Sequence, residues 1–344
     1  MIDDPVVTLA YLGWKPFFSE QVAIEEGVAG QPVRVMSVHR GRVTVMGEGF
    51  DGSISSSAAG DGAAEDRPTV GDWLLMDRGT RTIARILNRT SLFKRPAPTH
   101  DRRVQLIAAN VDTLFVVTSC NQDFNVARLE RYLVLARETG VRPVVVLTKA
   151  DLSPAPEPFV AAARALQMAL QVELVDARNP TNAARLARYC GAGATVALVG
   201  SSGVGKSTLI NTLIGSDDIA TQAVREDDGK GRHTTTVRQM HRLAGDAGGG
   251  GWLVDTPGMR ELQMSEVASG VTEVFEDVTS LALACRFANC AHADEPGCAI
   301  RAATTSGVLD PARVARWRKL SQEDRANSGG AFVRRPRPDR GGKR

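Results

Sequence analysis

The sequence is poor in aromatic residues, and it contains no long apolar run. Aromatic residues make up 5% of its 344 residues and hydrophobic residues 43%, so its cores must be built mainly from Val, Leu, Ile and Ala. No segment reaches the roughly 20 apolar residues that cross a bilayer, and the start Met1–Pro5 lacks the features of a secretory signal. We therefore expect a cytoplasmic chain with no membrane partner, and its length predicts two or three domains.

The net charge of the chain is only +3, but this charge is unevenly distributed. Residues 325–344 hold seven basic side chains against one acid, Asp339. A segment rich in Pro, Gly and Arg cannot bury itself, so we predict a disordered basic tail over these residues. Two roles are open for the tail: contact with a polyanion such as RNA, or solubilisation alone.

Cysteine is scarce, yet three of the five cysteines lie within 14 residues near the C-terminus. They alternate with a histidine, and the cluster consists of Cys285, Cys290, His292 and Cys298. In a chain without an export signal, such spacing indicates metal ligation rather than disulfides. Three sulfurs and one nitrogen are a known ligand set for one structural zinc ion, Zn²⁺, with no position left for a substrate. Cys120 and Cys190 lie outside the cluster, and we expect them to be packing residues.

The first 95 residues are typical of short strands joined by turns. The expected strands are Val33–Val38, Arg42–Met46, Trp73–Asp77 and Ile83–Leu87, with a break rich in Gly and Ser at Gly47–Gly62. Many short strands in a small segment favour a β-barrel similar to an OB-fold over residues 1–95, which would contact RNA. The basic turn His39–Arg42 fits either such a contact or a solvated hairpin.

From about Val104 onward, apolar strands alternate with helical patterns. The expected strands are Val111–Thr118, Pro143–Leu147, Val172–Val175, Thr195–Val199 and Trp252–Val254. The expected helices contain Leu129, Leu133 and Ala136, or span Phe159–Leu170, Thr181–Cys190 and Lys206–Ile214. This alternation predicts an α/β domain with a parallel, doubly wound sheet over residues 96–278. A helical domain with the Cys/His cluster follows at 279–324, and its last helix is expected to have Asp310 as N-cap and Pro311 as first residue.

One glycine-rich turn carries the pattern G-x-x-x-x-G-K-[ST]. It joins the strand Thr195–Val199 to a helix, which is the context that this motif needs. Its residues are Gly200, Ser201, Ser202, Gly203, Val204, Gly205, Lys206, Ser207 and Thr208. Backbone N–H groups of such a P-loop surround nucleotide phosphates. Lys206 can reach the β- and γ-phosphates, and the Ser207 hydroxyl can ligate Mg²⁺.

Two further segments predict which nucleotide is bound. Asp255-Thr256-Pro257-Gly258 follows a strand, so that Asp255 can hold Mg²⁺ through water and the N–H of Gly258 can contact a γ-phosphate. A base loop formed by Thr148, Lys149, Ala150 and Asp151 follows another strand. The Asp151 carboxylate can accept hydrogen bonds from guanine N1–H and its exocyclic amine, which favours GTP and GDP over ATP.

Two details of the base-reading region depart from the usual pattern. Thr148 stands where Asn is usual, and it lacks the amide with which Asn contacts the P-loop. Asp176-Ala177-Arg178 occupies the place of a second base-contacting loop, although Ser-Ala is common there.

Gly231–Thr236 lies between the P-loop helix and Asp255, where a switch segment belongs. Thr235 or Thr236 should close on Mg²⁺ and the γ-phosphate, and spacing does not choose between them. Met259 occupies the position where many GTPases carry a water-orienting Gln, so catalysis must come from elsewhere. His233 is our candidate catalytic residue, and partner binding or packing is the alternative for it.

The order of these motifs is unusual, because Asp151 precedes Lys206 by 55 residues. With the Gly231–Thr236 segment and the Cys285-x4-Cys290-x-His292-x5-Cys298 spacing, the chain resembles the ribosome small-subunit-dependent GTPase A family over about Leu12–Leu320. The resemblance implies an N-terminal OB-fold, a circularly permuted GTPase domain and a zinc-binding domain. It also implies a role in late maturation of the small ribosomal subunit, with GTP hydrolysis stimulated by that subunit. We expect the barrel, the zinc-binding domain and the basic tail to contact the rRNA of the subunit, and the chain to be a monomer.

Two other functions remain open at this level. A GTP-sensing RNA-binding protein with negligible intrinsic turnover is the main alternative, and Met259 favours it. A P-loop metabolic kinase is the other, but Asp151 and the permuted motif order argue against it. Under the leading interpretation the GTP form binds the subunit and the GDP form leaves it.

Overall fold

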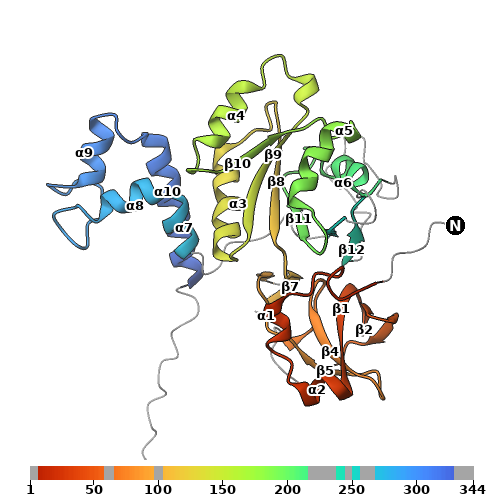
Figure 1. Cartoon of the computed structure of the whole chain (residues 1–344). Helices are drawn as coiled ribbons and strands as arrows, with labels where there is room; N and C mark the ends of the chain where they lie inside the picture. Colours follow the sequence, from red (N-terminus) through yellow and green to blue (C-terminus); the bar gives the residue numbers. More distant parts are fainter. Residues whose placement is uncertain are drawn as a thin grey trace, which may run out of the picture. The chain divides into compact units, whose positions relative to one another are not determined.

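The computed structural model describes residues 7–57, 66–96, 104–215, 238–244, 250–255 and 268–328. The chain forms two compact units, residues 1–263 and 264–344 (Figure 1). The predictions at His233, Thr235, Thr236, Gly258, Met259 and residues 329–344 lie outside the described residues.

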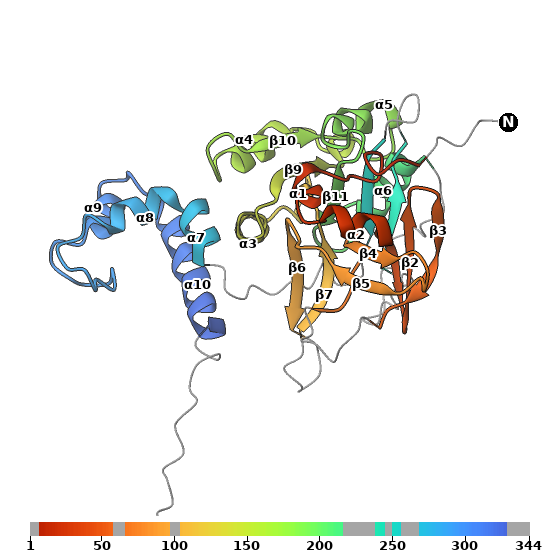
Figure 2. The same cartoon turned by 60° about the horizontal axis from the view of Figure 1, so that its bottom comes forward.

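The first unit opens with two short helices and five antiparallel strands (Figure 2). The elements are α1 (Pro16–Ser19), α2 (Ile24–Ala29), β1 (Gly30–His39), β2 (Arg42–Gly47), β3 (Phe50–Ser55), β4 (Trp73–Asp77) and β5 (Ile83–Ile86). The strands run in the order β3-β2-β1-β4-β5 and bury alternate residues such as Val33, Val35, Val43 and Val45 in one core. Five antiparallel strands around a single core agree with the predicted OB-like barrel.

The prediction of a break at Gly47–Gly62 was wrong for β3. Phe50–Ser55 pairs along its whole length with β2, and Ile54 is buried in the barrel core. Gly and Ser lower the local strand propensity, but cross-strand pairing and burial outweigh it. The patterns also missed a separate ribbon of β6 (Leu92–Pro96) and β7 (Val104–Ala109).

The rest of the first unit is an α/β sheet. Its parallel strands run in the order β10-β9-β8-β11-β13. Their bounds are β8 (Thr113–Ser119), β9 (Arg142–Thr148), β10 (Gln171–Leu174), β11 (Thr195–Val199) and β13 (Trp252–Asp255). The helices are α3 (Val126–Glu138), α4 (Glu157–Arg164), α5 (Pro180–Ala183) and α6 (Lys206–Ile214), with 3-10 turns η2 (Ala150–Leu152) and η3 (Ala184–Tyr189). One face packs on α5, η3 and α6, while α3 and α4 contact β8, β9 and β10 on the other (Figure 1). The doubly wound arrangement is therefore confirmed.

Two predicted helices are shorter or less regular than expected. The helix expected at Phe159–Leu170 ends at Arg164, and Ala169 has a left-handed backbone with φ of 58°. The segment Thr181–Cys190 is mostly 3-10 helix, whose three-residue turn places Leu186 and Tyr189 on one side, where both are buried. Core packing of these two side chains thus favours the tighter turn in the second segment.

The barrel and the α/β domain share one eleven-stranded sheet. Strand β12 (Arg238–Arg242), which no pattern predicted, pairs antiparallel with β13 on one side and with β1 on the other.

A buried cation also links the barrel to the α/β domain. The Arg34 guanidinium donates to the Leu12 carbonyl and to Thr195 Oγ1, the latter at 2.7 Å. Burial lowers the pKa of Arg34 to about 10, so the side chain stays charged at neutral pH.

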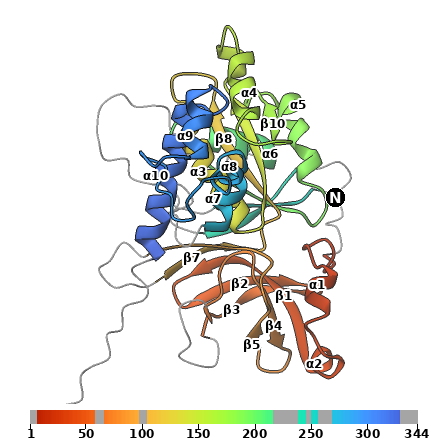
Figure 3. The same ribbon diagram turned by 90° about the vertical axis from the view of Figure 1, so that its left-hand side faces the viewer.

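The second unit is helical (Figure 3). Its helices are α7 (Ala268–Val274), α8 (Glu276–Ala282), α9 (Ala299–Thr305) and α10 (Pro311–Ser328). The Asp310 carboxylate accepts from the N–H of Ala312 at 2.9 Å, as predicted for an N-cap. The prediction of a disordered tail from residue 325 was wrong for its first four residues, because α10 continues past Asp324 to Ser328. Among the helices that the structure describes, none is long and apolar enough to cross a membrane.

Candidate functional site

The P-loop sits at the carboxyl end of a central strand. Strand β11 lies between β8 and β13, and the chain turns sharply at Gly200 before α6 begins at Lys206. Gly200 has φ of 147°, and a Cβ there would lie 2.2 Å from the Val117 carbonyl oxygen. Only glycine fits this close approach, so the loop is anchored on the neighbouring strand β8.

The Lys206 side chain lies inside the loop. It is 8% exposed, and its Nζ donates to the carbonyl oxygens of Gly200, at 2.8 Å, and Ser201. Its neighbour Gly205 is left-handed, with φ of 91°, at the start of the helix. A buried ammonium beside the N-terminus of a helix suits bound phosphate groups.

Thr148 contacts the P-loop, although it lacks the amide of the Asn that is usual at this position. Its side chain is fully buried, and its hydroxyl lies 2.6 Å from the Val204 carbonyl oxygen and 3.1 Å from that of Thr118. The hydroxyl has one proton, and the shorter distance favours donation to Val204. Thr148 therefore ties the base loop directly to the P-loop backbone.

The two predicted base loops lie at the same edge of the sheet. Lys149 takes a left-handed backbone with φ of 56° as β9 ends, and Asp151 follows in η2 with an exposed side chain. After β10, the Asp176 carboxylate accepts from the N–H of Arg178 at 2.9 Å. Thr212 of α6, which no motif singled out, donates to the Ala177 carbonyl at 2.6 Å. Since β9 and β10 are neighbours, the tertiary fold brings the two loops together.

Asp255 ends β13, beside the P-loop strand. It pairs across the sheet with Gln239 of β12, and its side chain is half-buried. Ser207, the other predicted Mg²⁺ ligand, is half-buried in the first turn of α6. Both therefore come from elements that meet at the carboxyl edge of the sheet.

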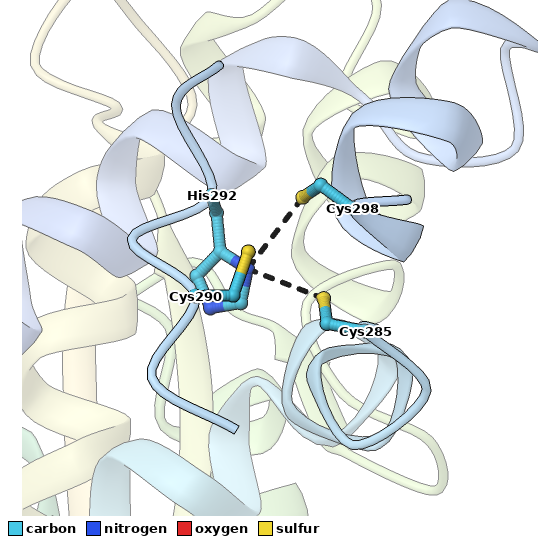
Figure 4. A group of neighbouring side chains, drawn as sticks. All are labelled: Cys285, Cys290, His292 and Cys298. Carbon is cyan, nitrogen blue, oxygen red and sulfur yellow. Dashed lines mark hydrogen bonds between the residues drawn. The ribbon is translucent and has the colours of Figure 1, made fainter. Parts of the chain in front are cut away.

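In the second unit, the four predicted metal ligands converge (Figure 4). The ligand atoms of Cys285, Cys290, His292 and Cys298 all lie within 4.8 Å of one another. His292 Nδ1 lies 3.5 Å from Cys285 Sγ and 3.7 Å from Cys298 Sγ. Tetrahedral Zn²⁺ with ordinary bond lengths would separate nitrogen and sulfur ligands by about 3.5 Å. The donor set and its spacing therefore fit zinc.

Backbone groups and neighbouring side chains support this cluster. The N–H groups of Ala299 and Arg301 point at sulfur, 3.4 Å from Cys285 Sγ and 3.5 Å from Cys298 Sγ. Glu295 accepts from two N–H groups of the loop that carries His292. These contacts orient the ligands, as outer-shell contacts do in protein metal sites.

A P-loop, the two predicted base loops and Asp255 at one sheet edge are typical of a P-loop nucleotide-binding protein with permuted motif order. A family model described as RsgA GTPase matches residues 86–265. Curated relatives include small ribosomal subunit biogenesis GTPase RsgA of Mesorhizobium japonicum, 49% identical over 324 residues, which cover 93% of this chain and 91% of that protein. The RsgA 2 protein of Vibrio vulnificus is 44% identical, covering 93% of this chain and 89% of its own. The chain belongs to the RsgA GTPase family and is a circularly permuted GTPase.

Solved structures agree with the fold. YjeQ from Thermotoga maritima superposes with a TM-score of 0.59 at 24% identity, covering 86% of this chain and 98% of its own. YloQ, described as a circularly permuted GTPase, gives a TM-score of 0.59 at 22% identity, covering 90% and 97%. At these identities the likeness concerns the fold alone.

Proposed function

We propose that this chain acts in late maturation of the small ribosomal subunit. The GTP-bound protein binds the subunit, and it leaves the subunit after it has hydrolysed GTP to GDP and phosphate. The relatives named above are small ribosomal subunit biogenesis GTPases, and the similarity to them spans nearly the whole chain. The convergence of base loops, P-loop and Asp255 at one edge is the observation that carries the nucleotide part.

We assign each predicted residue a role at the nucleotide. Lys206 and the N–H groups of Gly200–Thr208 hold the phosphates, Ser207 and Asp255 hold Mg²⁺, and Asp151 reads guanine. Bound Mg²⁺ would neutralise charge on the phosphates. Thr235 or Thr236 and the N–H of Gly258 sense the γ-phosphate, and His233 assists the attacking water.

The other parts of the chain serve subunit binding in this proposal. The barrel (1–95) and the basic tail (325–344) contact rRNA, the permuted domain (96–278) hydrolyses GTP, and residues 279–324 hold one structural Zn²⁺ on Cys285, Cys290, His292 and Cys298. The protein acts as a cytoplasmic monomer.

Turnover with and without small ribosomal subunits tests this proposal. GTP hydrolysis by the purified chain in Mg²⁺ buffer should be slow, and it should rise strongly when small subunits are added, with no comparable rise for large subunits or for ATP. If the hydrolysis rate does not rise while GTP still binds, the result would support a GTP-sensing RNA-binding protein instead.

His233→Ala should lose the stimulated rate while binding GTP normally, and full stimulation in this variant would exclude His233 from catalysis.

A further inference from the structure

The first turn of α3 lies beside the P-loop, although no nucleotide motif includes it. Strand β8 leads into α3, and β8 pairs with the P-loop strand β11 from Thr113↔Val196 to Val116↔Val199. The helix starts at a fixed point, because Asn125 Oδ1 accepts from the N–H of Arg128 at 3.0 Å. Arg128 is therefore the third residue of a well-anchored helix.

The Arg128 side chain reaches across to the phosphate-binding turn. Its Nη1 donates to Ser201 Oγ, and its other guanidinium N–H groups remain available for a ligand, since the side chain is exposed. Lys206 Nζ donates to the carbonyl of the same Ser201. Two positive charges thus converge on the first residues of the loop.

Helix stability does not explain a cation at this position. The positive end of the helix dipole favours acidic residues in the first turn, yet α3 has none there and carries Arg128 instead. Within the described residues, no carboxylate forms an ion pair with Arg128. Arg128 is unfavourable with respect to the helix dipole, and it contacts the P-loop through Ser201. An anionic ligand explains its position better than helix stability does.

We propose that Arg128 is a second cation of the phosphate site and contacts the γ-phosphate of bound GTP. This inference rests on the P-loop assignment proposed above. A guanidinium held in the same chain supplies positive charge where negative charge accumulates during phosphoryl transfer. Because GDP lacks the γ-phosphate, Arg128 should distinguish GTP from GDP, whereas Lys206 should hold both.

Nucleotide affinities and single-turnover rates of Arg128→Ala test the proposal. We expect the affinity for a non-hydrolysable GTP analogue to fall about tenfold or more, the scale of one charge-assisted hydrogen bond, with GDP affinity nearly unchanged. The hydrolysis rate at saturating GTP should fall at least as far. Arg128→Lys should recover part of both losses, because it retains the charge without the planar fork.

Three variants separate this role from simpler ones. Ser201→Ala should retain the preference for GTP, and Arg164→Ala, which removes an exposed arginine of α4, should behave as wild type. If Arg128→Ala and Ser201→Ala both lose affinity for GTP and GDP equally, Arg128 only supports the loop, and the proposal is overturned. Unchanged GTP affinity and rate in Arg128→Ala would also overturn it. Lys206→Ala should lose both nucleotides, and normal binding there would instead refute the P-loop assignment.

Discussion

The nucleotide site and the Cys/His cluster are built in opposite ways. The nucleotide site draws on segments from Thr148 to Asp255, and the sheet brings them together. The four cluster residues lie within 14 residues of sequence, in a unit whose helices are mostly short. A site held by a large sheet should keep its shape without ligand, whereas a cluster of thiols in a small unit should depend on its metal.

Metal removal should therefore have the largest effect, and it should be confined to the second unit. Structural zinc contributes about 10 kcal/mol or more to folding in small zinc domains. A strong chelator, or Cys290→Ser, should expose residues 268–328 to protease while leaving GTP binding intact. Metal analysis should find one zinc per chain before treatment. Loss of nucleotide binding together with the helices would contradict the independence of the two sites.

A methyl group at Gly200 should give the next largest effect, in the nucleotide site. Gly200→Ala places its Cβ 2.2 Å from the Val117 carbonyl oxygen, so β8 and the P-loop strand must separate. We expect the free energy of unfolding to fall by about 3 kcal/mol or more, and nucleotide binding to be lost. Gly41→Ala is the matched control, since Gly41 also has positive φ (74°) but no neighbouring atom within 4 Å. It should cost only about 1–2 kcal/mol.

The tie between base loop and P-loop should contribute less. Thr148→Val keeps the shape but removes the hydroxyl that faces the Val204 carbonyl. Leaving a buried acceptor unpaired costs about 1–3 kcal/mol. The free energy of unfolding, measured with urea, should therefore fall by that amount, and GDP should bind more weakly. Thr148→Ser retains the hydroxyl and should stay close to wild type. If valine and serine behave alike, the hydroxyl does not connect the two loops.

Thiol labelling tests the smallest expected effect. It should distinguish the buried cysteines Cys120 and Cys190 from the three cysteines of the Cys/His cluster. Burial raises the pKa of Cys120 to about 11 and that of Cys190 to about 12. The thiolate is the reactive form, so both should resist iodoacetamide at pH 8 and still at pH 9. Mass spectrometry should find no label on the zinc-loaded native chain, and three labels after chelation, on Cys285, Cys290 and Cys298. Labelled Cys120 or Cys190 in folded protein would contradict the burial of these two residues.

The sequence patterns located the strands of the α/β sheet and the P-loop helix well. Strand β11 and helix α6 have the predicted bounds, because a continuous apolar run and a glycine-rich turn each leave few alternatives. β3, β6, β7 and β12 were missed, because their stability comes from pairing with distant strands rather than from local composition. The four residues of the Cys/His cluster lie close together, as their short spacing in the sequence predicted.

The sequence by itself determined the P-loop motif, the permuted order of the motifs and a Cys/His set that fits zinc, because each depends on residue type at short spacing. Only the tertiary structure decided how distant segments connect. Thr148 replaces Asn by donating to Val204, and β12 joins the barrel to the α/β sheet. Arg128 likewise reaches Ser201, 73 residues away in the chain. Such contacts depend on strand order and side-chain reach, which local patterns do not encode.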